Sequence, residues 1–165
     1  MQNLIIYHRN IDPSLNLCSF LDKNIKKDEF YIPELKAYTS YPRYEICSPI
    51  KPFYDRVIGR AMMYLGISFA NFDSSIWAQI YTPTNNSRHP AHNHWSDVAV
   101  DFSWVHFIKT PDKRCFRFTN GHIPPQNDGD FIIFPSWAVH TILPFSGECD
   151  RMVVAGNVML KNAKR

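Results

Sequence analysis

Three histidines lie within six positions of one short stretch, "RHPAHNHWSD" (residues 88–97), although the chain of 165 residues contains only seven. They are His89, His92 and His94, and a further histidine, His140, follows in "FPSWAVHTILPF". Imidazole nitrogens are ligands for Fe(II), Zn(II), Cu and Ni, and three protein ligands on one face leave coordination positions open for substrate or oxygen. The stretch therefore indicates a candidate metal site.

The spacing of the histidines decides which of them can share an ion. His92 and His94 are two positions apart, and such side chains project to the same face of an extended segment. His140 lies in another strand-like segment and is suited to supply a third ligand. His89 is separated from His92 by a proline, so we expect it in a loop or beside the ligands. Spacing alone leaves open that these are ordinary surface or hydrogen-bonded histidines.

The residues before about position 72 predict helices that support the site. "IDPSLNLCSFLDKNI" (residues 11–25) places Asp12 to cap a helix, with Pro13 in its first turn. "SPIKPFYDRVIGRAMMYLG" (residues 48–66) carries apolar residues at three- and four-residue spacings, and Gly66 suits its C-terminal stop. We interpret this apolar stripe as a core face packed against a sheet.

The rest of the chain is dominated by candidate strands. Residues 26–47 lack a clear period and are expected to be irregular or short strands. From about residue 73, short β-branched and aromatic segments alternate with breakers; they are "SIWAQIYT", "VAVDFSWVHFIK", "RCFRFT", "DFIIFP", "AVHTILPF" and "RMVVAGNVML". No helical pattern separates them, which excludes a doubly wound parallel sheet and favours an antiparallel sandwich or jelly roll. We expect one domain over residues 1–165, with N-terminal support over about 1–72 and a strand-rich core over about 73–160.

Composition and charge narrow the class of protein. The chain is 45% apolar and 15% aromatic, and its formal net charge of +3 depends on Lys161, Lys164 and Arg165, so charge does not imply nucleic acid. No stretch approaches the roughly 20 apolar residues of a membrane span, and no signal-peptidase pattern is visible. Four scattered cysteines without a C-x-x-C pair are expected to be small buried hydrophobes in the cytoplasm. The oligomeric state is left open.

The segment from Trp77 to Asn157 resembles the small 2-oxoglutarate/Fe(II)-dependent oxygenases of bacteria and their phages. The resemblance rests on ordered pieces: "IWAQIYTP", "HNH", "SWVHFIKTP", "DGDFIIFPSWAVH" and "RMVVAGNV". The fourth piece is the closest match, and the last resembles the family's final strand, which begins with Arg and ends with Asn. The resemblance implies a mainly β, double-stranded β-helix (jelly-roll) fold with flanking N-terminal helices. It also implies a cytoplasmic location, which is the cytoplasm of the host if a phage encodes the chain.

The resemblance implies a reaction as well as a fold. His92, His94 and His140 are implied to bind Fe(II), which takes up 2-oxoglutarate and O2 to hydroxylate a substrate, with succinate and CO2 as co-products. The substrate is a small molecule or a residue of a protein, and the sequence does not rank these classes.

Arg151 is implied to hold the distal carboxylate of 2-oxoglutarate in a bidentate pair. Without the family, we would expect Arg151 to form a surface ion pair with Glu148 or Asp150. Tyr81 is a candidate for a further hydrogen bond to the co-substrate, with core packing as its alternative role. Four aromatic residues are suited to line the cavity, with packing in the sandwich as the commoner role of each: Trp95, Trp104, Phe107 and Trp137.

Two positions depart from the family's pattern. His94 stands where most of the superfamily has the carboxylate of an H-x-D motif. Asp97 or Asp101 is therefore an alternative ligand, with one histidine outside the metal's coordination shell. Phe107 replaces a tyrosine that often helps to hold the co-substrate, so that hydroxyl is lost.

Two other functions stay open at this point. A three-histidine jelly roll also suits cupin-type dioxygenases, which bind substrate directly to the metal and need no 2-oxoglutarate; a requirement for Arg151 separates the two. The domain could instead be a non-catalytic binding module with a vestigial or zinc-filled site. Metal content, and its loss in His92→Ala, separates that case from both enzymes.

Overall fold

A computed structural model describes residues 4–5, 7–11, 16–67, 71–83, 88–95, 100–112, 114–145 and 148–161. The larger of its two sheets comprises β1 (Tyr7–Asn10), β2 (Tyr31–Ile32), β3 (Ala37–Thr39), β4 (Phe72–Ser74), β5 (Trp77–Tyr81), β7 (Phe102–Lys109), β9 (Asp130–Pro135) and β11 (Arg151–Leu160). The smaller sheet comprises β6 (His89–His92), β8 (Phe116–Phe118) and β10 (His140–Ile142).

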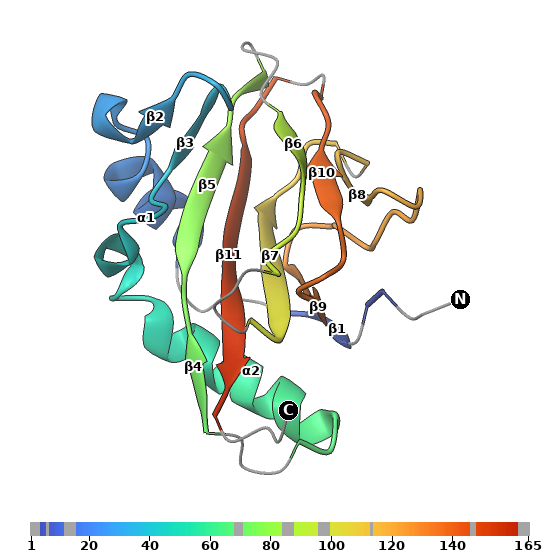
Figure 1. The fold of residues 1–165 in the computed structure, drawn as a ribbon. Coiled ribbons are helices and arrows are strands. Elements are labelled where there is room, and N and C mark those ends of the chain that lie inside the picture. Colours follow the sequence, from blue (N-terminus) through green and yellow to red (C-terminus); the bar gives the residue numbers. More distant parts are fainter. Residues whose placement is uncertain are drawn as a thin grey trace.

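The two sheets form a sandwich with helices on one side (Figure 1). The order in the larger sheet is β1-β9-β7-β11-β5-β3-β2, with β4 also paired to β11, and the order in the smaller sheet is β6-β10-β8. All pairings among the described strands are antiparallel. The mainly β, double-stranded β-helix fold expected from the sequence is confirmed.

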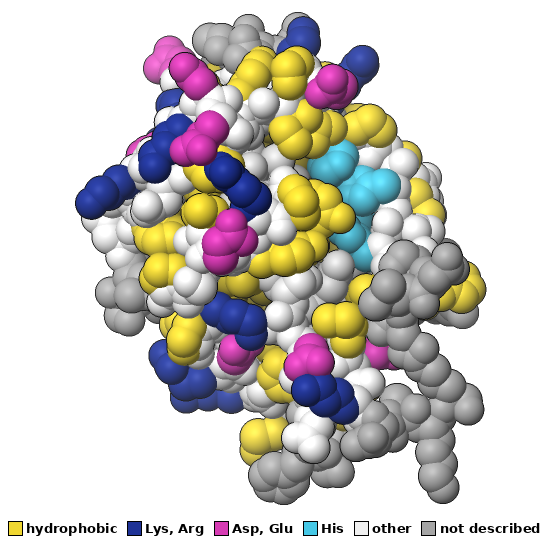
Figure 2. All heavy atoms as spheres, turned by 60° about the vertical axis from the view of Figure 1, so that its left-hand side comes forward, with side chains coloured by type: hydrophobic (Ala, Val, Ile, Leu, Met, Phe, Trp, Pro, Cys, Tyr) yellow, Lys and Arg dark blue, Asp and Glu magenta, His cyan; other side chains and the backbone are white. Residues whose placement is uncertain are grey.

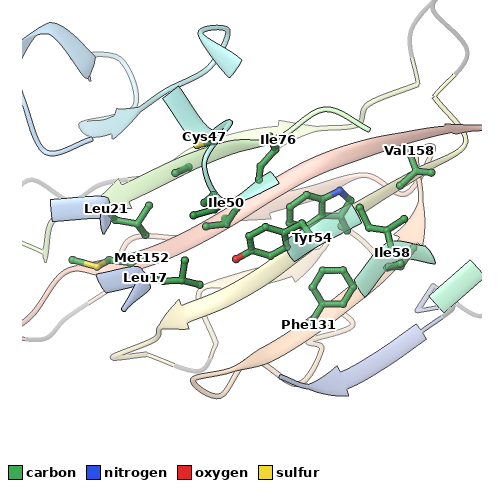
Figure 3. Close-up of a cluster of buried hydrophobic side chains, with 14 of the residues drawn as sticks. Leu17, Leu21, Cys47, Ile50, Tyr54, Ile58, Ile76, Phe131, Met152 and Val158 are labelled. Atoms are coloured by element: carbon green, nitrogen blue, oxygen red, sulfur yellow. The ribbon is translucent and has the colours of Figure 1, made fainter. Parts of the chain in front are cut away.

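Helix α2 (Lys51–Tyr64) covers the outer face of the larger sheet, as its apolar stripe predicts. Its first turn contains Pro52, and Gly66 follows its end with a φ of 72°, a conformation that favours glycine. Figure 3 shows Tyr54 and Ile58 of α2 among buried side chains of the sheet and of helix α1 (Leu17–Asn24). Neither described helix is long and apolar enough to span a membrane.

The start of α1 differs from the prediction. The helix begins at Leu17, where the side chain of Asn16 accepts a hydrogen bond from the backbone N–H of Ser19. The predicted cap Asp12 and the neighbouring Pro13 lie outside the described residues.

Alternation along β11 divides its side chains between two cores. One set packs toward the helices and the other faces the smaller sheet. The two sets are Met152, Val154 and Val158 on the helix side, and Arg151, Val153 and Ala155 on the inner side. The inner face of the larger sheet is thus the surface on which a site between the sheets is built.

The segment between α1 and α2 contains short elements, as expected for residues 26–47. They are the 3-10 segments η1 (Asp28–Phe30) and η2 (Tyr44–Cys47), with β2 and β3 between them. Strand β1 was not expected; its four residues, YHRN, pair with β9 at the edge of the larger sheet and are mostly exposed.

Candidate metal centre

Three imidazoles meet at one end of the smaller sheet. His92 ends β6 and His140 begins β10, and these two residues are direct partners across the strands. The ring of His92 lies 4.4 Å from that of His140 and 5.1 Å from that of His94, measured between centroids. One ligand nitrogen from each residue lies within 4.8 Å of the other two. In Figure 2 the histidine side chains form one group on the surface, bordered by hydrophobic side chains.

Backbone carbonyls orient two of these rings. The Nδ1–H of His92 donates to the carbonyl of Pro90 over 2.8 Å, and the Nδ1–H of His140 donates to the carbonyl of Ala138 over 3.0 Å. A carbonyl can only accept, so each Nδ1 carries the proton and each Nε2 keeps its lone pair. Rings held in this way present Nε2 to a metal ion.

The imidazoles are neutral at pH 7. Burial, with a further contribution from the neighbouring histidines, lowers the pKa of His140 to about 3 and that of His94 to about 4. Burial also lowers the pKa of His92 from its ordinary value. A metal ion binds the neutral form, so no proton has to leave these rings at neutral pH.

Arg151 lines the same narrow cavity as the three imidazoles. It is 0% exposed, and none of its three guanidinium nitrogens has a hydrogen-bond partner in the described part of the chain. Its Cζ atom lies 5.2 Å from the ring centre of Tyr81 and 5.7 Å from that of Phe107. A buried cation without an acceptor is costly, so this position is suited to receive an anion.

The expected alternative for Arg151, a surface ion pair, is wrong because the side chain is buried. Asp150, one of its two candidate partners, pairs with Lys26 instead.

A hydrogen-bonded chain leads from Tyr81 toward the metal ligands. The Tyr81 hydroxyl donates to Oε1 of Gln79 over 2.8 Å and lies 3.3 Å from Nδ1 of His89. Because that hydroxyl proton is already given to Gln79, its oxygen accepts from the Nδ1–H of His89. His89 stacks on His92 with 4.1 Å between ring centres. His89 therefore lies beside the ligands, as expected, and outside the group of three.

Comparison with known proteins bears on the fold. No protein-family model matches the sequence, and no curated protein matches it. A prolyl-4-hydroxylase from Pseudomonas putida superimposes with a TM-score of 0.63 over 94% of this chain and 92% of that chain, at 16% identity. What the two share is the fold.

Two further solved structures are similar to this chain in fold. A prolyl 4-hydroxylase from Phytophthora capsici gives a TM-score of 0.59 over 89% of this chain and 53% of that chain, at 13% identity. An oxidoreductase of the 2OG-Fe(II) oxygenase family from Burkholderia pseudomallei gives 0.51 over 61% of this chain and 51% of that chain, at 15% identity. The chain thus has the double-stranded β-helix fold found in 2OG-Fe(II) oxygenases.

The structure directs Asp101 away from the imidazoles. Its carboxylate accepts a hydrogen bond of 2.7 Å from the backbone N–H of Leu160, at the far end of β11 from Arg151. The alternative of Asp101 as the carboxylate ligand is therefore wrong. Asp97, the other alternative, lies outside the described residues.

The four aromatic residues expected around the cavity lie in different environments. Phe107 lies on the inner face, where it packs in the core between the sheets. Trp104 contributes to the lining of the cavity, but its ring stacks on Tyr54 of α2 with 4.8 Å between centroids, which is the packing role given as the alternative. Trp95 is 72% exposed and Trp137 is 39% exposed, so neither forms a closed wall.

Sequence reasoning missed the role of Trp77 and Gln79 in the site. Both line the cavity next to the histidines, and both alternate with Tyr81 along β5. The signal was present, because positions 77, 79 and 81 share one face of a strand.

Proposed function

We propose that this protein is a non-haem Fe(II)- and 2-oxoglutarate-dependent oxygenase of the hydroxylase type. The observation that carries the proposal is Arg151, a buried guanidinium without an acceptor in the described structure, in the same cavity as three imidazoles. 2-Oxoglutarate has a carboxylate for the guanidinium at one end and a metal-chelating 2-oxo acid at the other. A cavity lined by both a buried cation and three metal-ligating side chains suits a ligand with these two ends.

The residues present fit both groups. His92, His94 and His140 would hold Fe(II), for which imidazole nitrogen is a suitable donor. Three neutral imidazoles leave the 2+ charge of the ion uncompensated, and this favours an anionic chelating ligand over a neutral one. Among the described residues, the group of ligands contains no carboxylate, so the anionic co-substrate would supply the negative charge.

When bound, Fe(II) and 2-oxoglutarate supply the activation of O2 and the oxidation of a C–H bond. Arg151 would hold the distal carboxylate in a charge-assisted hydrogen-bonded pair, which burial of the guanidinium would strengthen. The rings of Tyr81 and Phe107 exclude water from this pair. His89 contacts both the Tyr81 hydroxyl and the ring of His92, so it would help to position both side chains.

The three-imidazole set also supports a second candidate. A cupin-type dioxygenase would bind its substrate directly to the metal and use no 2-oxoglutarate. In that case Arg151 has no part in the reaction, and a neutral residue at this position is tolerated. A non-catalytic binding module is the remaining possibility raised by the fold.

Formation of succinate tests the proposal. The protein is loaded with Fe(II) and supplied with O2, 2-oxoglutarate and ascorbate, which provides the two electrons that a substrate would otherwise supply, and succinate is followed by NMR. We expect succinate from the wild type and from Lys161→Gln, which removes an exposed cation that pairs with Asp73. We expect none from His140→Ala, and at least about fivefold less from Arg151→Gln when 2-oxoglutarate is kept below the half-saturation of the wild type, because its affinity falls about tenfold.

Each other outcome identifies a rival. Stoichiometric iron without succinate would contradict the proposal and favour the cupin-type dioxygenase. Absence of iron binding would leave the binding module.

A further inference from the structure

A wide groove of about 710 Å³ opens beside the three imidazoles. Among the residues that the structure describes, its lining contains no Asp, Glu, Lys or Arg. The charged side chains of Glu34, Lys36 and Arg88 line a separate hollow. Away from the metal ligands, a charged group that contacts these described residues would therefore lose water without meeting an opposite charge. Figure 2 shows hydrophobic side chains bordering the histidine group on this face.

One wall of the groove is aromatic. The ring of Trp77 lies 5.7 Å from that of His94, and Tyr41 and Tyr44 continue outward at 5.6 and 6.3 Å from Trp77. Tyr41 is 52% exposed and Tyr44 is 37% exposed, although both are large and mostly apolar. Rings of a ligand stack favourably on such surfaces. The wall leads from solvent to the candidate metal centre.

Two amides stand on either side of Trp77 on the floor of the groove. Oε1 of Gln79 accepts from the Tyr81 hydroxyl over 2.8 Å, and Oδ1 of Asn157 accepts from the Ser103 hydroxyl over 2.9 Å. With its oxygen engaged inside the protein, each amide offers its NH2 group, a donor, to a ligand. Both residues line the groove.

We propose that the primary substrate is an uncharged, ring-bearing small molecule with carbonyl-type oxygens. Its ring lies on the wall formed by Trp77, Tyr41 and Tyr44, and its oxygens accept hydrogen bonds from Gln79 and Asn157. This inference rests on the proposed function, because it takes the groove beside the three imidazoles to be where the oxygenase holds its substrate.

The test uses the protein loaded with Fe(II) and 2-oxoglutarate without oxygen, so that Arg151 is occupied. Binding of N-methylphthalimide, a neutral flat ring with two carbonyls, is measured by ligand-observed NMR. It is compared with 4-methylbenzoate and benzyltrimethylammonium, which carry charges of opposite sign. We expect the neutral ring to bind at least about tenfold more tightly than either ion, a difference of about 1.4 kcal/mol.

Two variants and one control locate the binding. Asn157→Asp keeps the acceptor for Ser103 but replaces the donor by a negative oxygen, so we expect weaker binding of N-methylphthalimide and stronger binding of benzyltrimethylammonium. Tyr44→Ala removes part of the aromatic wall and should weaken the binding of N-methylphthalimide several-fold. Tyr64→Ala removes an aromatic ring that is 79% exposed on α2, outside the groove, and should leave the binding of all three compounds unchanged.

The outcomes separate this inference from the proposed function, because the 2-oxoglutarate complex is followed in the same sample by its visible absorption. A sample that forms the complex but binds the ions as well as the neutral ring overturns the inference alone. So does binding that is unchanged in Asn157→Asp and Tyr44→Ala. A sample that shows the expected pattern without forming the complex supports the substrate site and contradicts the oxygenase proposal.

Discussion

Arg151 lowers the stability of the ligand-free protein. Its guanidinium is fully buried, and its nitrogens have no hydrogen-bond partner within the described ranges. Such an arrangement costs free energy in the absence of a ligand and is retained where binding requires it. Stability therefore gives a direct test of whether the residue is functional or structural.

We expect Arg151→Met to raise the free energy of unfolding of the ligand-free protein by about 1–3 kcal/mol, because a flexible apolar chain fills the space without a buried charge. The same variant should no longer be stabilised by 2-oxoglutarate. Urea unfolding with and without 2-oxoglutarate measures both effects. A variant less stable than the wild type would mean that Arg151 has a partner in the folded protein.

Metal binding should distinguish the ligand histidines from their neighbour. We expect His140→Ala to weaken Fe(II) binding by at least about a hundredfold, the loss of one of three ligands on a shared ion. His89→Ala is the matched control: it removes a ring stacked on His92 that lies outside the group of three, and it should keep stoichiometric metal. Metal content after gel filtration tests this prediction, and equal losses in both variants would place His89 among the ligands.

His106 makes the stability of the protein depend on pH. It lies on the helix side of the sheet, 2.8 Å from the Tyr54 hydroxyl, and burial lowers its pKa to about 4. In the unfolded chain the pKa is about 6.5, so below that pH the unfolded state takes up a proton that the folded state does not. The stability contribution is complete above pH 6.5 and is lost as the pH falls toward 4.

For this one residue we expect a loss of about 2 kcal/mol between pH 7.5 and pH 5. In His106→Gln, whose side chain can still hydrogen-bond to Tyr54, the free energy of unfolding should fall by about 2 kcal/mol less over the same pH interval. Urea unfolding of the metal-free proteins at the two pH values gives the comparison. Equal losses in the two proteins would show that His106 does not titrate as the geometry implies.

At the scale of elements, β11 is the strand that joins the core to the site. It pairs with β5, β7 and β4, and it carries Arg151 at its start and Asn157 near its end. Between them, Gly156 leaves room for its neighbours: a Cβ atom there would lie 2.0 Å from the carbonyl oxygen of Ser75 and 2.6 Å from the ring of Trp104.

We expect Gly156→Ala to lower the free energy of unfolding by about 3 kcal/mol or more, because a backbone oxygen and a packed ring cannot both move aside. Gly59→Ala is the control. Gly59 lies inside α2, and a Cβ atom there would meet nothing within 4 Å, so alanine should stabilise the protein by about 0.5–1 kcal/mol. Thermal unfolding of the two variants measures the contrast, and similar melting temperatures would contradict the close packing over β11.

Much of the fold follows from periodicity in the sequence. The stripe of α2 and the strands β9 and β11 have long apolar patterns, and each was predicted within a few residues. Strand β1 was missed because its exposed polar residues carry no such pattern. Which role Trp104 takes could not be settled from its residue type; its ring packs against α2, as does His106 two positions later on the same side of the strand.

The candidate site was predictable in part. The H-x-H pair and His140 carry a local signal, and the resemblance added Arg151. The chain from Gln79 through Tyr81 to His89 could not be found in the same way, since it joins β5 to β6 and depends on how the two sheets face each other. The groove beyond Trp77 likewise depends on Tyr41 and Tyr44, which come from the segment before α2.

At the scale of the whole molecule, the two sheets contribute different halves of the proposed site. The smaller sheet and the residues after β6 supply the three imidazoles, and the larger sheet supplies Arg151 and the floor of the groove. A ligand that contacts the metal and Arg151 together must therefore lie between the sheets. The double-stranded β-helix fold provides the space for such a ligand, and the residues on its inner faces decide which one it is.

The most direct test of this account is an anaerobic titration of 2-oxoglutarate into the Fe(II)-loaded protein, followed by its visible charge-transfer absorption. We predict a saturable band in the wild type. In Arg151→Gln the half-saturation concentration should rise at least about tenfold, as expected for the loss of a charge-assisted hydrogen bond. A wild-type protein that holds iron but develops no band, or a band that is equally strong and equally saturable in Arg151→Gln, would contradict the account.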